Sequence, residues 1–194
     1  MRQRLTVLGI LGAVLMSGVL SCGGDKTAPQ QSVLWFGLGT ALGSTCSSAR
    51  TFSFPDDTAR DTIIGASGNG ARAVDGGDDL VECTVKQNAS GADYNVSLRF
   101  QGGEVGNFIA SGVLKAPAAV AAGQDAVDTD GTVDINFNTG QFALREQGCT
   151  AKVHTLVPGA IWLRSLNCDA LKDPSSPSIS CQGTGGAIFE NCSH

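Results

Sequence analysis

Alternation of apolar and polar residues, the pattern of a β-strand with one buried face, recurs along most of this chain. The clearest examples are Tyr94–Phe100 and Val133–Phe137. Further short runs, most of them bounded by glycine, are Val33–Leu38, Thr51–Phe54, Leu80–Val85, Asn107–Leu114, Phe142–Leu144, Lys152–Val157, Ala160–Leu166 and Ala187–Glu190. Many short strands separated by turn residues predict an all-β fold, an antiparallel β-sandwich of about eight to ten strands.

Two sequence signals predict hairpin turns. Asn138–Gly140 ends the Val133 run with a glycine where a left-handed conformation is needed. Pro158-Gly159 separates two strand-like runs, and a two-residue turn there pairs residue i with residue 317 − i, which places Cys149 opposite Cys168. A one-residue slip offsets the two cysteines, and Pro-Gly favours a turn type that splays hairpins.

Two segments are predicted to be loops. Ala116–Ala126 has helical composition, but Pro117 and Gly123 limit any helix in it to a turn or two. Lys172–Ser178 is rich in proline and serine and is expected to be an exposed loop.

The N-terminus has the layout of a secretion signal. Arg2 and Arg4 precede the uncharged, mostly apolar run Leu5–Leu20, and the small residue Ser21 follows it. The run is short for a membrane-spanning helix, which needs about 20 apolar residues, and it contains three glycines. A spanning helix and an ordinary signal peptide remain the alternatives.

Cys22 directly after Ser21 resembles the lipobox of bacterial lipoproteins. The resemblance implies that the thiol of Cys22 is lipidated, for example with palmitate, and that the cysteine becomes the first mature residue. Gly23 in the next position implies the outer membrane, since an aspartate there signals inner-membrane retention in enteric bacteria. We therefore expect a signal peptide at 1–21, the lipidated cysteine and a flexible tether at 22–32, and one domain at 33–194.

The other six cysteines form an even set once Cys22 is assigned to lipid. Export predicts disulfides, whereas the spacings between cysteines are too long for a structural zinc site. Six cysteines allow 15 pairings. We expect the pairs Cys46–Cys83, Cys149–Cys168 and Cys181–Cys192.

The charge of the mature chain bears on its partners. Loss of Arg2 and Arg4 with the signal leaves 11 basic and 18 acidic residues, a net charge of −7. The absence of a basic cluster argues against nucleic acid and against a polybasic grip on anionic lipid. The expected partners are the membrane, through the lipid anchor, and an unidentified envelope protein.

The acidic stretch around Asp128, Asp130 and Asp134 is the candidate metal site. Its Asp-x-Asp-Gly core is similar to the middle of a calcium loop, but Ala126 and Phe137 occupy the positions of the key first and last ligands. Turn chemistry ahead of a strand is the simpler interpretation, and a weak calcium site is the alternative.

Catalytic motifs are absent from the sequence. Neither Gly-x-Ser-x-Gly nor Ser-x-x-Lys occurs, and a triad would have to use His154, inside a predicted strand, or His194, the last residue. We expect no catalytic residue and no cofactor. The aromatic residues Trp35, Phe36, Tyr94 and Trp162 are candidate sugar-stacking platforms, although their strand spacing favours core positions.

The C-terminal half is similar to small cysteine-rich predicted lipoproteins of myxobacteria, through Cys149, Trp162, Cys168, Cys181 and the ending Phe189–Cys192. That resemblance implies no activity. The sequence therefore favours a non-catalytic binding or structural module of an envelope assembly. The alternatives are a secreted-type hydrolase or carbohydrate-active enzyme, and a calcium or small-ligand module.

Overall fold

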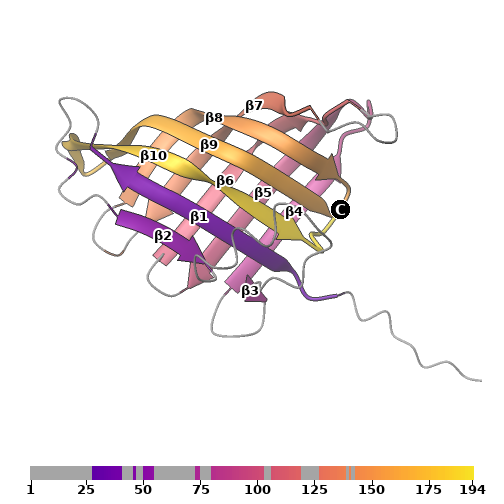
Figure 1. The fold of residues 1–194 in the computed structure, drawn as a ribbon, viewed down its shortest axis with the longest axis horizontal. Coiled ribbons are helices and arrows are strands. Elements are labelled where there is room, and N and C mark those ends of the chain that lie inside the picture. Colours follow the sequence, from indigo (N-terminus) through magenta and orange to yellow (C-terminus); the bar gives the residue numbers. More distant parts are fainter. Residues whose placement is uncertain are drawn as a thin grey trace, which may run out of the picture.

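The computed structural model of this chain describes residues 28–40, 46, 50–54, 73–74, 80–102, 106–118, 127–138, 140 and 143–194. Within these ranges the chain forms ten β-strands and no helix (Figure 1). None of these residues therefore belongs to a helix that is long and apolar enough to cross a membrane. The predicted signal peptide, Cys22 and the segment Ala119–Ala126 lie outside the described residues.

The strands are named in chain order. They are β1 (Gln31–Gly39), β2 (Arg50–Phe54), β3 (Ala73–Val74), β4 (Leu80–Gln87), β5 (Asp93–Gly102), β6 (Gly106–Lys115), β7 (Thr129–Asn138), β8 (Ala143–Val157), β9 (Ala160–Asp173) and β10 (Ser176–Glu190). All of the expected strand runs fall within them, except that Phe142 lies outside the described residues.

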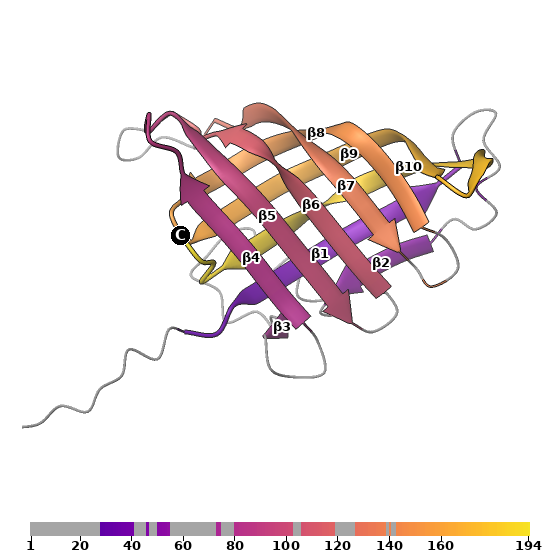
Figure 2. The ribbon, with the colours of Figure 1, turned by 180° about the vertical axis from the view of Figure 1, so that it is seen from behind.

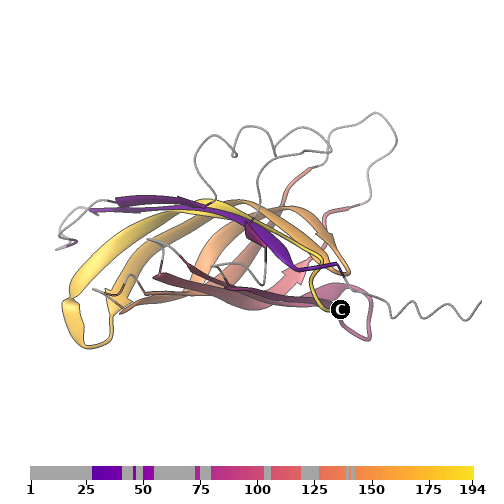
Figure 3. The same ribbon diagram turned by 90° about the horizontal axis from the view of Figure 1, so that it is seen from below.

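The strands form one continuous sheet in the order β2-β1-β10-β9-β8-β7-β6-β5-β4, with β3 paired to the start of β1. All pairings between these strands are antiparallel. The sheet curls into a half-barrel, so that β4 and β5 lie across from β1 and β10 (Figures 2 and 3). The two halves of the curled sheet supply the two layers of a sandwich, which confirms the predicted all-β, disulfide-stapled fold.

The core lies between the two layers. Alternate residues of each strand point into it, as in β5, where Leu98 and Phe100 are fully buried. At its centre, the rings of Phe36, Phe108 and Phe137 from three strands contact one another with centroids 5.4 to 6.4 Å apart. These distances are in the favourable range for aromatic pairs.

A second apolar cluster lies on the outer face of β1, β9 and β10. It consists of Val33 and Ile188 with the half-buried rings of Trp35 and Trp162 packed against them. Because side chains alternate along a strand, Trp35 points away from the core that its neighbour Phe36 enters. Of the four aromatic candidates, Phe36 and Tyr94 are core residues, whereas the two tryptophans are not.

The β8–β9 hairpin has the predicted register. Val157 pairs with Ala160 across the Pro158-Gly159 turn, and Thr150 pairs with Asn167 in the same register after two compensating irregularities. The turn glycine, Gly159, has a φ of +82°, which only glycine adopts without strain. Cys149 and Cys168 are bonded, with Cα atoms 4.6 Å apart, as the predicted register requires.

The other two predicted disulfides are wrong. Cys46 bonds Cys181, and Cys83 bonds Cys192, instead of Cys46–Cys83 and Cys181–Cys192. Cys181 and Cys192 cannot meet, because the extended strand β10 separates them by about 35 Å at 3.3 Å per residue. Cys46 instead follows β1, whose last residue pairs beside Cys181 in the antiparallel ladder with β10.

The predicted loop at Lys172–Ser178 is wrong in its bounds, although several of its residues are exposed as expected. β9 extends to Asp173 and β10 begins at Ser176, so that only Pro174 and Ser175 form the turn. The carboxylate of Asp173 accepts hydrogen bonds from the hydroxyl of Ser175, at 2.6 Å, and from its backbone N–H, at 2.8 Å. These two bonds hold the pKa of Asp173 below its usual 3.8.

We predict that Gly185→Ala destabilises the fold strongly, because β10 and β1 approach each other too closely there for a side chain. A Cβ atom on Gly185 would lie 2.1 Å from the backbone oxygen of Trp35, so one strand must shift. Overpacking of this kind costs about 1 to 3 kcal/mol. Gly39→Ala is the matched control, since a Cβ atom on Gly39 meets nothing within 4 Å. Thermal unfolding of both variants tests this, and equal melting temperatures would contradict it.

Candidate functional site

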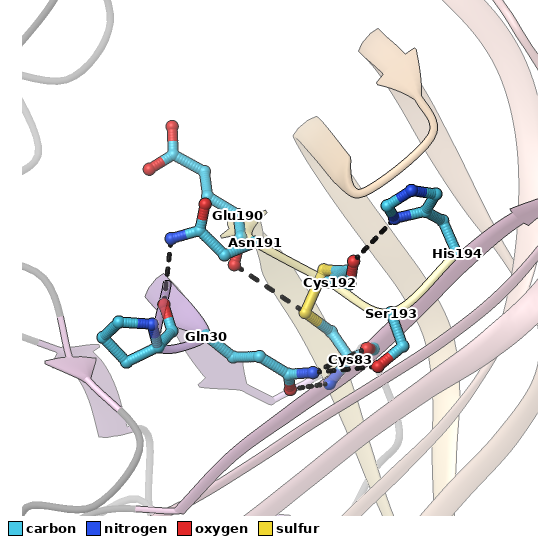
Figure 4. The surroundings of a disulfide bond; sticks show 8 residues. Gln30, Cys83, Glu190, Asn191, Cys192, Ser193 and His194 are labelled. Atoms are coloured by element: carbon cyan, nitrogen blue, oxygen red, sulfur yellow. Dashed lines mark hydrogen bonds between the residues drawn. A yellow bond between two sulfur atoms is a disulfide. The ribbon is translucent and has the colours of Figure 1, made fainter. Parts of the chain in front are cut away.

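A groove of about 1140 Å³ lies at the end of the sheet where the described chain begins. Four segments line it: the residues before β1, the start of β4, the β8–β9 turn and the C-terminus. These segments meet there because β1 and β10 pair at this end, with Gln31 opposite Glu190. The disulfide Cys83–Cys192 crosses the same end of the molecule (Figure 4).

Gln30 fixes the segment before β1 to the edge strand β4. Its side-chain oxygen accepts a 2.7 Å hydrogen bond from the backbone N–H of Cys83, and its side-chain nitrogen donates to the Cys83 carbonyl at 3.2 Å. The same nitrogen lies 3.3 Å from the hydroxyl of Ser193 (Figure 4). One amide side chain thus takes the place of a neighbouring strand along part of the β4 edge.

The C-terminal residues pair with the same part of this edge. Ser193 donates its backbone N–H to the Cys83 carbonyl at 3.0 Å and accepts from the N–H of Val85 at 2.9 Å, in a parallel bridge. The N–H of Cys192 donates to the carbonyl of Gly159 at 2.8 Å. We call the bonds that Gln30, Cys192 and Ser193 make here, together with the disulfide, the clasp.

The clasp corrects the predicted boundary between tether and domain. The tether was expected to run to Ser32, but β1 begins at Gln31 and Gln30 is hydrogen-bonded to the domain. Pro29 is held as well, because its carbonyl accepts a 2.9 Å hydrogen bond from the side chain of Asn191. The described chain therefore joins the domain at Pro29, four residues before the predicted start of the domain at Val33.

The groove is lined by polar and apolar residues, two of which are acidic. Glu82 and Glu190 contribute carboxylates, and neither lysine nor arginine is among the described residues that line it. Glu82 also forms a 2.9 Å ion pair with Arg99 on β5. The ring nitrogen Nδ1 of His194 lies 3.5 Å from the Cys192 carbonyl, at the rim of the groove (Figure 4).

His154 forms a second arrangement, on the outer face of β8. Its Nδ1 lies 2.7 Å from a carboxylate oxygen of Asp128, and Arg164 lies 3.5 Å from the other oxygen. The imidazole also packs edge-on against Trp162, with ring centroids 4.1 Å apart. The carboxylate orients the ring as a general base requires. His154 does not line the groove at the clasp.

The three aspartates of the candidate calcium site have separate partners. Asp128 contacts His154, Asp130 forms an ion pair with Lys152 at 2.5 Å, and Asp134 accepts a 2.9 Å bond from the N–H of Gly148. The hydrogen bond to Asp130 raises the pKa of Lys152 above 10.5. Among the described residues these carboxylates do not gather around one point.

Glu146, Cys149 and Cys168 do have ligand atoms within 4.8 Å of one another. Both cysteine sulfurs belong to one disulfide, however, and a metal would need them as thiolates. The Glu146 carboxylate accepts from the backbone N–H groups of Asp169 and Ala170, at 3.1 and 2.8 Å. The Glu146 side chain therefore links β8 to the backbone of β9.

Comparison with protein-family models, with curated proteins and with solved structures finds no match to this chain. The assignment of a function therefore depends on the geometry described above.

Gln30→Ala should destabilise the protein, because it leaves the N–H of Cys83 without its partner. A buried donor that loses its bond costs about 1 to 3 kcal/mol. Gln147→Ala, at an exposed glutamine of β8, is the matched control and should change stability by less than about 0.5 kcal/mol. Urea unfolding of the two variants tests the clasp, and equal midpoints would contradict its role.

Proposed function

We propose that this protein is a lipid-anchored lipoprotein of the bacterial outer membrane, and that its domain is a non-catalytic binding or structural module of an envelope assembly. The anchor is the lipidated Cys22, and the partner is an envelope protein. Multiple acyl chains supply the membrane affinity, at about 0.8 kcal/mol for each buried methylene.

The clasp is the observation that best supports this proposal. Cys22 precedes Ala28 by six residues, and the chain is bound to the domain from Pro29 onward. An anchor so close to a fixed attachment point keeps the domain near the membrane surface. A protein that holds a partner in one place needs such a connection, whereas a soluble enzyme does not.

The disulfides and the sheet edge support the same proposal. Cys46–Cys181 and Cys83–Cys192 span 135 and 109 residues, and bonds that close loops of this size stabilise a fold by nearly 5 kcal/mol each in the chain-entropy model. Among the described strands, β2 ends the sheet opposite β4. Its outer edge is suited to strand addition by a partner.

Lipidation is tested by expressing the protein in a Gram-negative host with labelled palmitate, beside a Cys22→Ser variant. We expect label in the parent protein and none in the variant, because the thiol of Cys22 is the acceptor. Equal label in both proteins, or none in either, would refute the anchor.

The His154–Asp128 pair favours a second candidate function, a secreted-type hydrolase or carbohydrate-active enzyme. The pair has the orientation of the base and carboxylate of a catalytic triad. A triad also needs a nucleophile beside the His154 ring. The described contacts of this ring are with Trp162 and Asp128, and neither residue is a nucleophile of that kind. We therefore assign the pair a structural role on the outer face.

We predict that His154→Ala folds with a loss of about 1 kcal/mol, from one hydrogen bond and one ring contact, and retains its cellular role. Thermal unfolding measures the loss of stability, and complementation of a strain that lacks the protein measures the cellular role. A variant that folds normally but fails to complement would favour the hydrolase. Asp128→Asn, which keeps the shape of the carboxylate, should behave like His154→Ala under the contact-only function.

A further inference from the structure

We propose that a second pocket, on the outer face of β6, β7 and β8, binds a neutral saccharide. The pocket encloses about 400 Å³, which lies within the range of about 300 to 1,000 Å³ for small-molecule sites. Six of the residues that line it are Ile109, Ser111, Asp134, Asn136, Arg145 and Gln147. This inference goes beyond the proposed function and does not depend on the lipid anchor.

A β-bulge lies at this pocket. Asp134 of β7 is opposite two residues of β8, Gln147 and Gly148, because the register of the β7–β8 ladder shifts there. Gly148 has a φ of +75°, as a glycine in such a bulge can adopt. Glu146, just before the bulge, turns toward β9, where both of its carboxylate oxygens accept from backbone N–H groups. Bulges redirect side chains beside binding sites, and this one interrupts the regular outer face of the sheet.

The polar side chains of the pocket retain hydrogen-bonding capacity for a ligand. One oxygen of Asp134 accepts the 2.9 Å bond from Gly148, which fixes the carboxylate and leaves its second oxygen available. Within the part of the chain that the structure describes, the side chains of Ser111, Asn136 and Arg145 have no hydrogen-bond or ion-pair partner. A hydroxyl and an amide both donate and accept, a guanidinium only donates, and a carboxylate only accepts. Sugar hydroxyls, which do both, satisfy all of these groups.

The charges around the pocket balance one another, which favours a neutral ligand. Asp134 and Glu146 supply two carboxylates, Arg145 supplies a guanidinium, and Lys172 pairs with Arg145 across β8 and β9. An ionic ligand would meet charges of both signs and would still lose its own hydration. A neutral ligand with several hydroxyls can bond to the charged groups without that loss.

Ile109 gives the pocket an apolar surface. It lies between the core residues Phe108 and Ala110 on β6, so its side chain points to the outer face, where it is half-buried. The C–H face of a sugar ring can bury apolar area against this side chain while its hydroxyls reach the polar residues. An aliphatic contact and several hydrogen-bonding groups around one small pocket are the features that recognise a saccharide.

A titration followed by amide NMR tests the proposal on the purified full protein, kept in a detergent without a sugar headgroup. The probes are the methyl glycosides of glucose, galactose, mannose and N-acetylglucosamine. At least one should shift the amide signal of Gly148 with a Kd of about 10 mM or tighter, because Gly148 is bonded to the Asp134 carboxylate. The amide of Gly159, in the clasp, should not shift. Failure of all four glycosides to shift Gly148 would overturn the proposal.

Matched variants locate the binding. Arg145→Ala should weaken the affinity for the glycoside by at least about fivefold, because the ligand loses a charged donor. Arg164→Ala is the control, since this arginine of β9 contacts Asp128 and lies outside the pocket. Asp134→Asn keeps an oxygen for the N–H of Gly148 but removes the negative charge. It should weaken binding of the neutral glycoside and strengthen binding of glucuronate.

Three other results would also overturn the proposal. One is a parent protein that binds glucuronate or glucosamine more tightly than every neutral glycoside. Another is unchanged affinity in both Arg145→Ala and Asp134→Asn, with thermal unfolding showing that the variants are folded. The third is a glycoside that shifts Gly159 and leaves Gly148 unchanged. The Gly148 signal of the parent protein needs no substitution, so it decides the question even where a variant fails to fold.

Discussion

The pairing of the first strand with the last is the interaction on which the rest of this structure depends. Strands β4 to β10 pair with their neighbours in sequence, whereas β1 enters the sheet only by meeting β10. Contacts between such distant segments must overcome a larger loss of chain entropy than hairpins do. Two disulfides bracket this ladder: Cys46–Cys181 lies beyond its Gly39 end and Cys83–Cys192 beyond its Gln31 end.

The same pairing forms the candidate functional surfaces. Because β1 and β10 are antiparallel, the beginning and the end of the domain arrive at one place, where Gln30 and Ser193 share the edge of β4. The pairing also places Trp35 opposite Gly186. The Trp35 ring lies so close to this glycine that a Cβ atom on Gly186 would be 2.2 Å from the ring. The clasp, the groove and the outer tryptophan cluster are therefore consequences of one ladder.

The sequence predicts those parts of the molecule that depend on neighbouring residues. Alternation located the strands, and a two-residue turn at Pro158-Gly159 placed Cys149 opposite Cys168. The long-range disulfides and the clasp were missed, because no local pattern shows that β1 meets β10. Gln30 in particular lies in a polar stretch with the composition of a linker, and only the free edge of β4 gives its amide a partner. In the sequence His154 is recognisable only as a lone histidine, because its carboxylate partner lies 26 residues away.

The connectivity of the cysteines has a consequence for how the protein matures. Synthesis proceeds from the N-terminus, so Cys46 and Cys83 are available to each other before Cys181 and Cys192 have been made. Oxidation in that order joins two residues that are not partners in the finished fold. Correct pairing then requires exchange through mixed disulfides, which takes seconds to hours and is governed by the supply of a reactive thiol. If oxidation follows the order of synthesis, production of this protein therefore depends on disulfide isomerisation as well as on oxidation.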